Sequence, residues 1–204
     1  MPRPNRVHPD GSFLTTPARG TLMGNRGILH DAEGRIGPAR WRHRNWVCCL
    51  LSFRGRHRRL LAPGHYTELF FLDEAVALAA GHRPCAECRR ADYRRWQAAW
   101  ARAFGDSPPA PEMDARLHAA RAEPGARGLR HETAKAGDLP DGAVFAVAAR
   151  AWLRLGGRAL PYAPEGWGAP EPLPGGTVRA LTNAVTRRIL QAGYAPRLHP
   201  SAGT

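Results

Sequence analysis

The sequence predicts an α+β fold, in which a small antiparallel sheet with helices is followed by a second small α+β unit. Short apolar segments, among them 46–53, 68–72 and 143–147, are separated by glycine and proline, as strands of antiparallel sheets are. Between these groups the segment 88–104 repeats aromatic residues every three or four positions, which is the period of a helix. With 204 residues, 43% of them hydrophobic, the chain is long enough for one sizeable core or two small domains.

The first half is expected to contain a hairpin or meander. Residues 1–20 are rich in proline and glycine and are expected to be irregular, and 21–31 indicates a turn before a short apolar segment. Residues 46–53 form a strong strand candidate. We further expect a turn at 54–57, a return strand at 58–62 and another strand at 68–72.

Two helices are expected next. Asp73 is a suitable N-cap for a short helix over 74–80 that ends at Gly81. A second helix is predicted from 88 to 104, ending at Gly105, with Tyr93, Trp96, Trp100 and Phe104 on one face. We interpret this aromatic stripe as core and not as a surface for stacking bases.

The sequence of the second half of the chain predicts a linker, a helix and a small strand-rich unit. Residues 107–111 contain adjacent prolines and indicate a linker, and 112–122 indicates a helix. Strands are expected at 143–147, at 151–155, through Leu160 and Tyr162, and at 177–181; Thr182 is then expected to cap a helix over 183–192. We therefore expect three parts: a basic domain at 1–106, a linker and helical segment at 107–140, and a small α+β unit of unknown role at 141–204.

Cys85-Ala86-Glu87-Cys88, here named the cysteine turn, indicates a metal site. Two cysteines separated by two residues can direct both sulfurs toward one point, and Zn²⁺ with bonds of ~2.3 Å then closes the turn. A redox dithiol or ordinary packing are the alternatives, but a redox motif of this type follows a strand, whereas this one follows a predicted helix. The predicted fold is thus a small antiparallel sheet with a zinc knuckle and helix, followed by a second small α+β unit.

Cys48 and Cys49 are the other two cysteines of the chain, and zinc needs further ligands. Adjacent residues of a strand point to opposite faces, so only one of them meets the cysteine turn unless a bulge intervenes. Both faces of the strand are apolar, and the pattern does not choose between them. Two ligand sets remain open: all four cysteines, or three cysteines with His65 or His82.

The charge of the chain indicates a polyanionic partner. The formal net charge is +13, and no acidic residue lies between Glu33 and Glu68. Arginines interleaved with tryptophans suit a phosphate backbone and stacked bases, so we expect nucleic acid as the partner, with DNA favoured over RNA. A biased genome composition is the alternative. The residues expected to bind nucleic acid are Arg54, Arg56, Arg58, Arg59, Arg89 and Arg90.

Residues 70–90 resemble the second half of the zinc domain at the N-terminus of the Ada DNA-repair protein family. The likeness consists of a strand, a short alanine-rich helix and the sequence Gly81-His82-Arg83-Pro84 before the cysteine turn. It extends over about 46–90 if Cys48 and Cys49 stand for the first ligand pair, which the family spaces as Cys-x-x-x-Cys. The resemblance implies a zinc site formed by Cys48, Cys49, Cys85 and Cys88, contact with DNA, and acceptance of a methyl group from a DNA phosphotriester by a cysteine of the first pair.

Three functions remain open from the sequence. The first is a zinc protein that binds nucleic acid without catalysis, and the second is an enzyme on DNA, either a methyl acceptor or a nuclease in which Asn25, His30 and Asp31 act together. The third is a structural or protein-interaction zinc protein. No apolar run is long enough to span a bilayer, and the start of the chain lacks the apolar region of a secretory signal, so we expect a cytoplasmic protein without membrane contact.

Overall fold

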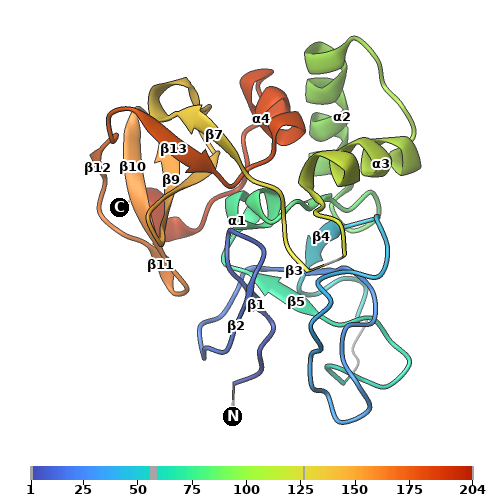
Figure 1. The fold of residues 1–204 in the computed structure, drawn as a ribbon. Coiled ribbons are helices and arrows are strands. Elements are labelled where there is room, and N and C mark those ends of the chain that lie inside the picture. The colour runs from blue at the N-terminus through green and yellow to red at the C-terminus, as the bar shows by residue number, and fades with distance from the viewer. Residues whose placement is uncertain (1, 56–58, 126, 204) are drawn as a thin grey trace.

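The computed structural model describes residues 2–55, 59–125 and 127–203 and has the predicted α+β fold. Two sheets lie on either side of the shortest α-helix, and the longer helices pack along one side of the molecule (Figure 1). The helices in the described ranges are α1 (Glu74–Ala79), α2 (Arg90–Phe104), α3 (Ala110–Arg121) and α4 (Ala184–Gln191), with short 3-10 turns at Ala136–Asp138 and Pro200–Gly203. None of these helices is both long and apolar enough to cross a membrane.

The first sheet is built from very short strands. Its strands are β1 (Arg6–Val7), β2 (Phe13–Leu14), β3 (Leu22–Asn25), β4 (Val47–Leu50), β5 (Leu69–Phe71) and β6 (Arg83–Pro84). They lie in the order β2-β1-β5-β3-β4-β6. Most pairs are antiparallel, but β1 runs parallel to β5 and β4 parallel to β6, so the sheet is mixed.

Residues 1–20 are not wholly irregular, because β1 and β2 form a hairpin. Its turn is made by Asp10 and Gly11: the amide of Gly11 donates to the His8 carbonyl at 2.8 Å, and the amide of Ser12 donates to Asp10 Oδ1 at 2.8 Å. Gly11 has a φ of 88°, which suits glycine. Two-residue strands are too short to produce a sequence alternation, which explains why the pattern did not predict them.

The pairing of the predicted strand at 46–53 also differs from a local meander. Within 46–53 only β4 forms a strand, and it pairs with β3 on one side and with β6 on the other. The strand β3 lies in 21–31, a segment in which a turn was expected. The predicted return strand at 58–62 is wrong for its described residues, 59–62, which form no strand. Leu61 has a left-handed φ of 54°, and its amide donates to Glu68 Oε2 at 2.9 Å instead of to a strand.

The second sheet is antiparallel throughout. Its strands are β7 (Glu132–Lys135), β8 (Val144–Val147), β9 (Arg150–Leu155), β10 (Arg158–Ala163), β11 (Gly166–Trp167), β12 (Glu171–Pro172) and β13 (Thr177–Ala180). The order is β11-β10-β9-β8-β13-β7, and β12 also pairs with β10. The predicted strands of this unit are confirmed, whereas β7 was missed because its polar residues are mostly exposed at the sheet edge and do not alternate.

The helices follow the predicted signals closely. Asp73 caps α1, with its Oδ1 accepting from the amide of Val76 at 3.0 Å, and α2 ends at Gly105 as expected. Asn183, and not Thr182, caps α4, because the Thr182 hydroxyl instead accepts from the amide of Val144 at 2.9 Å.

The prediction that the large aromatic residues belong to the core is confirmed. The side chains of Trp46, Trp96 and Trp100 are fully buried. The aromatic stripe of α2 therefore packs inside the protein, with Phe104 at its end partly buried, and its two tryptophans cannot stack on bases.

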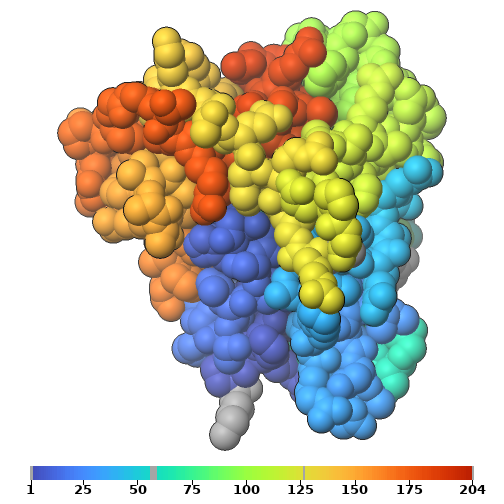
Figure 2. Space-filling view, in the orientation of Figure 1, coloured from blue at the N-terminus to red at the C-terminus, as the bar shows by residue number. Residues whose placement is uncertain are grey.

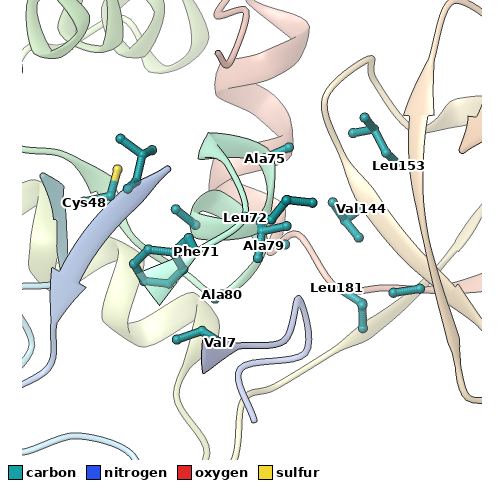
Figure 3. Close-up of a cluster of buried hydrophobic side chains, with 14 of the residues drawn as sticks. Val7, Cys48, Phe71, Leu72, Ala75, Ala79, Ala80, Val144, Leu153 and Leu181 are labelled. Carbon is teal, nitrogen blue, oxygen red and sulfur yellow. The ribbon is translucent and has the colours of Figure 1, made fainter. Parts of the chain in front are cut away.

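The hydrophobic core runs between the two sheets. Figure 3 shows Ala75 and Ala79 of α1 between Phe71 of the first sheet and Val144, which belongs to the second. A second buried cluster joins the aromatic face of α2 to the sheet residue Phe145. The predicted parts 1–106 and 141–204 thus contribute to the same clusters, and their division into domains stays a prediction.

Candidate metal centre

Three cysteine sulfurs gather at one end of the first sheet. Cys49 lies on β4, and Cys85 and Cys88 lie on the cysteine turn between β6 and α2. Their Sγ atoms are all within 4.8 Å of one another. Tetrahedral zinc with Zn–S bonds of ~2.3 Å separates its sulfurs by ~3.8 Å, so a small closing movement around the ion is sufficient. The donor set therefore fits Zn²⁺.

The backbone holds the cysteine turn against β4. The parallel pair β4–β6 places Cys48 opposite Pro84, and the amide of Cys85 donates to the Cys48 carbonyl at 3.0 Å. Two further amides, those of Glu87 and Leu50, donate to the sulfurs of Cys85 and Cys88 at 3.4 Å each. Such donors stabilise thiolates and orient them toward a metal.

The three thiols also influence one another's ionisation. Hydrogen bonds from Cys49 and Cys88, with the nearby amides, lower the pKa of Cys85. Hydrogen bonding to Cys85 and Cys88, together with burial, raises the pKa of Cys49. The first thiol of the group therefore ionises readily, but its negative charge opposes ionisation of the other two. A divalent cation would stabilise all three thiolates together.

Cys48 points away from this group. Its side chain is fully buried, and its sulfur accepts a hydrogen bond from the Arg89 guanidinium at 2.9 Å. Burial raises the pKa of Cys48 to about 12, although the charge of Arg89 opposes the shift. The alternation along β4, which the sequence left undecided, thus directs Cys49 to the cysteine turn and Cys48 to the core.

The two histidines considered as ligands lie elsewhere. His82 is fully buried, with its ring 4.6 Å from that of Phe71, and Arg26 donates to its Nε2 at 3.5 Å. His65 is exposed, and neither histidine belongs to the sulfur group. Within the described ranges the ligand group consists of three cysteines, all of them partly exposed.

Arg89 fixes the start of α2 from inside the protein. Its Nη2 lies 2.8 Å from carboxylate oxygens of both Glu74 and Asp92. Glu74 in turn accepts from the Tyr194 hydroxyl at 2.6 Å and from the Arg197 amide at 2.8 Å. The guanidinium of Arg89 is therefore engaged in the interior, and the cysteine turn is connected to α1 and to the C-terminal segment.

The remaining predicted nucleic-acid residues divide into two groups. Arg54, Arg59 and Arg90 are exposed, with Arg54 at a left-handed φ of 52° and 5.0 Å above the Phe53 ring. Arg90 begins α2, two residues after Cys88, so it lies beside the three clustered cysteines. Arg56 and Arg58 lie outside the described residues.

Asn25, His30 and Asp31 do not come together as a nuclease-like group. His30 is buried, with its Nδ1 2.6 Å from the Thr67 hydroxyl, whereas Asp31 is exposed and pairs with Arg35 at 2.7 Å. Asn25 is bonded to His43 at 3.1 Å. Each side chain therefore has a different partner.

Two buried arginines were not predicted from the sequence. Arg26 and Arg121 lie with their guanidinium carbons 4.5 and 3.9 Å from the centre of the Trp46 ring. Arg26 donates to the carbonyls of Gly11 and Ala80, and Arg121 to that of Gly81. No local signal in the sequence distinguishes these arginines from the exposed ones, because their partners are backbone groups far away in the chain.

Comparison with known proteins gives no relative for this chain: no family model, no curated protein and no solved structure matches it. Any proposal for its function therefore rests on its own residues.

Proposed function

We propose that this chain is a zinc protein that binds nucleic acid through an arginine-rich surface next to its metal centre. The observation that carries the proposal is the convergence of three sulfurs from Cys49, Cys85 and Cys88. Thiolate ligands favour zinc among the common divalent cations, and three of them leave one coordination position for a further ligand.

The nucleic-acid part of the proposal is supported by charge. The chain carries a formal net charge of +13, and a surface of this sign attracts phosphate groups and releases their counterions. Arg54 follows the strand that carries Cys49, and Arg90 follows the cysteine turn. Zinc would hold these two exposed guanidiniums in a fixed relation to each other, which is the benefit of a metal at this place.

The experiment combines metal analysis with DNA titration. We expect one zinc per chain, measured by mass spectrometry of the native protein. Duplex DNA is then titrated at several salt concentrations with the wild type and with the double variant Arg54→Gln/Arg90→Gln. Removal of one phosphate-binding charge lowers the slope of log K against log salt by ~0.9, so we expect a decrease of ~1.8 for the double variant.

The matched control is Arg150→Gln/Arg158→Gln, which removes the same charge from exposed positions of the second sheet. The control is expected to keep the wild-type slope. Equal slopes for all three proteins would contradict binding at Arg54 and Arg90.

A second candidate is acceptance of a methyl group by a cysteine of the metal group. It is favoured by the partial exposure of the three cysteines, because a zinc-bound thiolate is a nucleophile when a substrate can reach it. The sulfur would form a bond to the methyl carbon, the carbon–oxygen bond to the phosphotriester would break, and the electron pair would leave with the phosphodiester anion.

Mass spectrometry tests this candidate directly. After incubation with DNA carrying methyl phosphotriesters, a methyl group on Cys49, Cys85 or Cys88 would support it, and an unchanged mass of all peptides would exclude it. Buried Cys48 serves as the internal control, because its sulfur is not accessible in the folded protein.

A further inference from the structure

A basic cavity lies beside the β1–β2 hairpin. It has a volume of about 280 Å³. Four parts of the chain that are distant in sequence form it: the β1–β2 turn with Asp10–Ser12, Arg40, the 127–131 loop, and Arg179 of β13. Figure 2 shows the N-terminal residues, in blue, in contact with the loop that follows α3, in yellow. None of the three clustered cysteines lines this cavity.

The cavity carries an excess of positive charge. Arg40, Arg127 and Arg179 line it, and in the described part of the chain none of the three has a carboxylate partner. Arg40 is held in place by a hydrogen bond to the Gly37 carbonyl at 3.2 Å and by the Phe13 ring, 4.9 Å from its guanidinium carbon. Three guanidiniums therefore remain available for an anion.

One carboxylate, that of Asp10, also lines the cavity, but it is already engaged. Its Oδ1 accepts from the Ser12 amide at 2.8 Å and lies 2.9 Å from His8 Nδ1. A single carboxylate with local partners does not neutralise three arginines. The net charge of the lining thus stays positive.

His131 adds a second, independent observation. Its Nδ1 is buried and has no hydrogen-bond partner among the residues that the structure describes, an arrangement that is costly unless a ligand or water completes it. Burial, and then the charge of Arg179, lowers the pKa of His131, so its imidazole is neutral near pH 7. A neutral imidazole can donate to, or accept from, a group bound beside the arginines.

We propose that this cavity is a phosphate-binding site formed by Arg40, Arg127 and Arg179. Each guanidinium can donate two parallel hydrogen bonds to a pair of phosphate oxygens. Three guanidiniums therefore suit a phosphate, with its three or four oxygens, better than a carboxylate, which has two. The volume is at the small end for ligand sites, which suits a phosphate with its nearest substituents and not a whole cofactor. The phosphate comes either from free phosphate and its monoesters or from a nucleic-acid backbone; in the second case the inference rests on the proposed function.

The test uses the full zinc-loaded protein and two probes, inorganic phosphate and duplex DNA. Calorimetric titration with phosphate compares the wild type with Arg179→Gln and Arg127→Gln. Loss of one charge-assisted hydrogen bond weakens binding by about tenfold or more, and both variants are expected to show this loss. Arg150→Gln, on β9 of the same sheet and outside the cavity, is the matched control and is expected to change the affinity by less than about twofold.

The DNA arm separates the two sources of phosphate. If Arg179→Gln lowers the salt slope of DNA binding by ~0.9 and Arg150→Gln does not, the cavity holds a backbone phosphate. If phosphate binds and Arg179→Gln leaves DNA binding unchanged, or no DNA binds at all, the cavity is a site for free phosphate or a monoester. Absence of phosphate binding with an unchanged DNA slope, or equal losses in Arg179→Gln and Arg150→Gln, would overturn the inference. Neither result would affect the zinc site, which is measured by metal content and by the variants at Arg54 and Arg90.

Discussion

The two sheets of this protein are held together in different ways. The first consists of strands of two to four residues in mixed directions, whereas β9 and β10 of the second have six residues each and form a regular antiparallel hairpin. Every buried charged side chain of the described residues lies in the range from Arg26 to Arg121, and the buried polar residues after it are Thr182, Asn183 and Thr186. From β8 to β11 the second sheet is therefore formed by pairing between neighbours in sequence and by apolar packing, while the first depends more on specific polar contacts and, we propose, on a metal.

The largest expected effect is loss of the proposed zinc ion. Cys88→Ser removes one of three sulfur ligands, and because metal binding and folding are coupled in small sites, we expect loss of zinc and of order in the first sheet. Hydrogen exchange would show reduced protection in β3–β6 and retained protection in β8–β10. Ala86→Ser, an exposed change on the same turn, is the control. Full protection of the first sheet in Cys88→Ser, or in the wild type with chelator, would show that the first sheet does not depend on a metal.

A change in the core shared by the two halves comes next. Trp96 of α2 is fully buried, with its ring 5.2 Å from that of Tyr194. Trp96→Ala should lower the free energy of unfolding by about 3–5 kcal/mol, as truncation of a large core residue does. Urea unfolding measures it, with half-buried Gln97→Ala on the same helix as control. A near-neutral Trp96→Ala would mean that α2 does not join the two sheets.

Removal of the buried charge of Glu74, at the contact between α1 and the C-terminal segment, is expected to have a somewhat smaller effect. Glu74→Gln keeps the shape of the side chain but removes the charge that faces Arg89. We expect a loss of about 3 kcal/mol, at the low end for a broken buried pair, because Asp92 still faces Arg89. Thermal and urea unfolding measure it, and exposed Glu171→Gln is the control. Equal stabilities of the two variants would mean that the ion pair between Glu74 and Arg89 does not stabilise the folded protein.

The smallest effect concerns the β1–β2 turn and depends on pH. Burial acts to raise the pKa of Asp10, but hydrogen bonds from His8 and Ser12 outweigh it, and the pKa lies well below its usual range. A lowered folded-state pKa gives stability that is present above the unfolded value of about 3.9 and is lost as pH falls through the folded value. Asp10→Asn should therefore be less stable at pH 7 and show a flatter decline below about pH 5. Urea unfolding from about pH 2 to pH 7 checks this, and parallel curves for the two proteins would contradict it.

The second sheet and the helices were largely predictable from the sequence, because their signals are local. Gly156 and Gly157 mark the turn of the β9–β10 hairpin, and Asp73 and Gly105 mark helix ends within a few residues of the groups they satisfy. The strands β1, β2 and β6 have two residues each, and β1 and β6 also pair with strands far away in the chain, as when Arg6 pairs with Phe70. Local sequence patterns contain no such information.

The metal centre was predictable in part for the same reason. The cysteine turn is a local motif, and spacing alone identified its two cysteines as a candidate ligand pair. The choice between Cys48 and Cys49 required the position of Arg89, which provides a partner for one sulfur inside the core. The inward direction of Arg89 is itself set by Glu74, a residue that the sequence offered only as part of a helix.

The separation of Cys48 from Cys49 has a practical consequence for chemical labelling. Sulfurs that are adjacent in the chain face different surroundings, so a thiol reagent meets two classes of cysteine. With the metal removed, alkylation should reach Cys49, Cys85 and Cys88 first, whereas Cys48 reacts only after its strand leaves the core. Labelling of Cys48 thus measures the fraction of molecules in which the core around β4 has opened. The protein contains its own chemical reporter of unfolding.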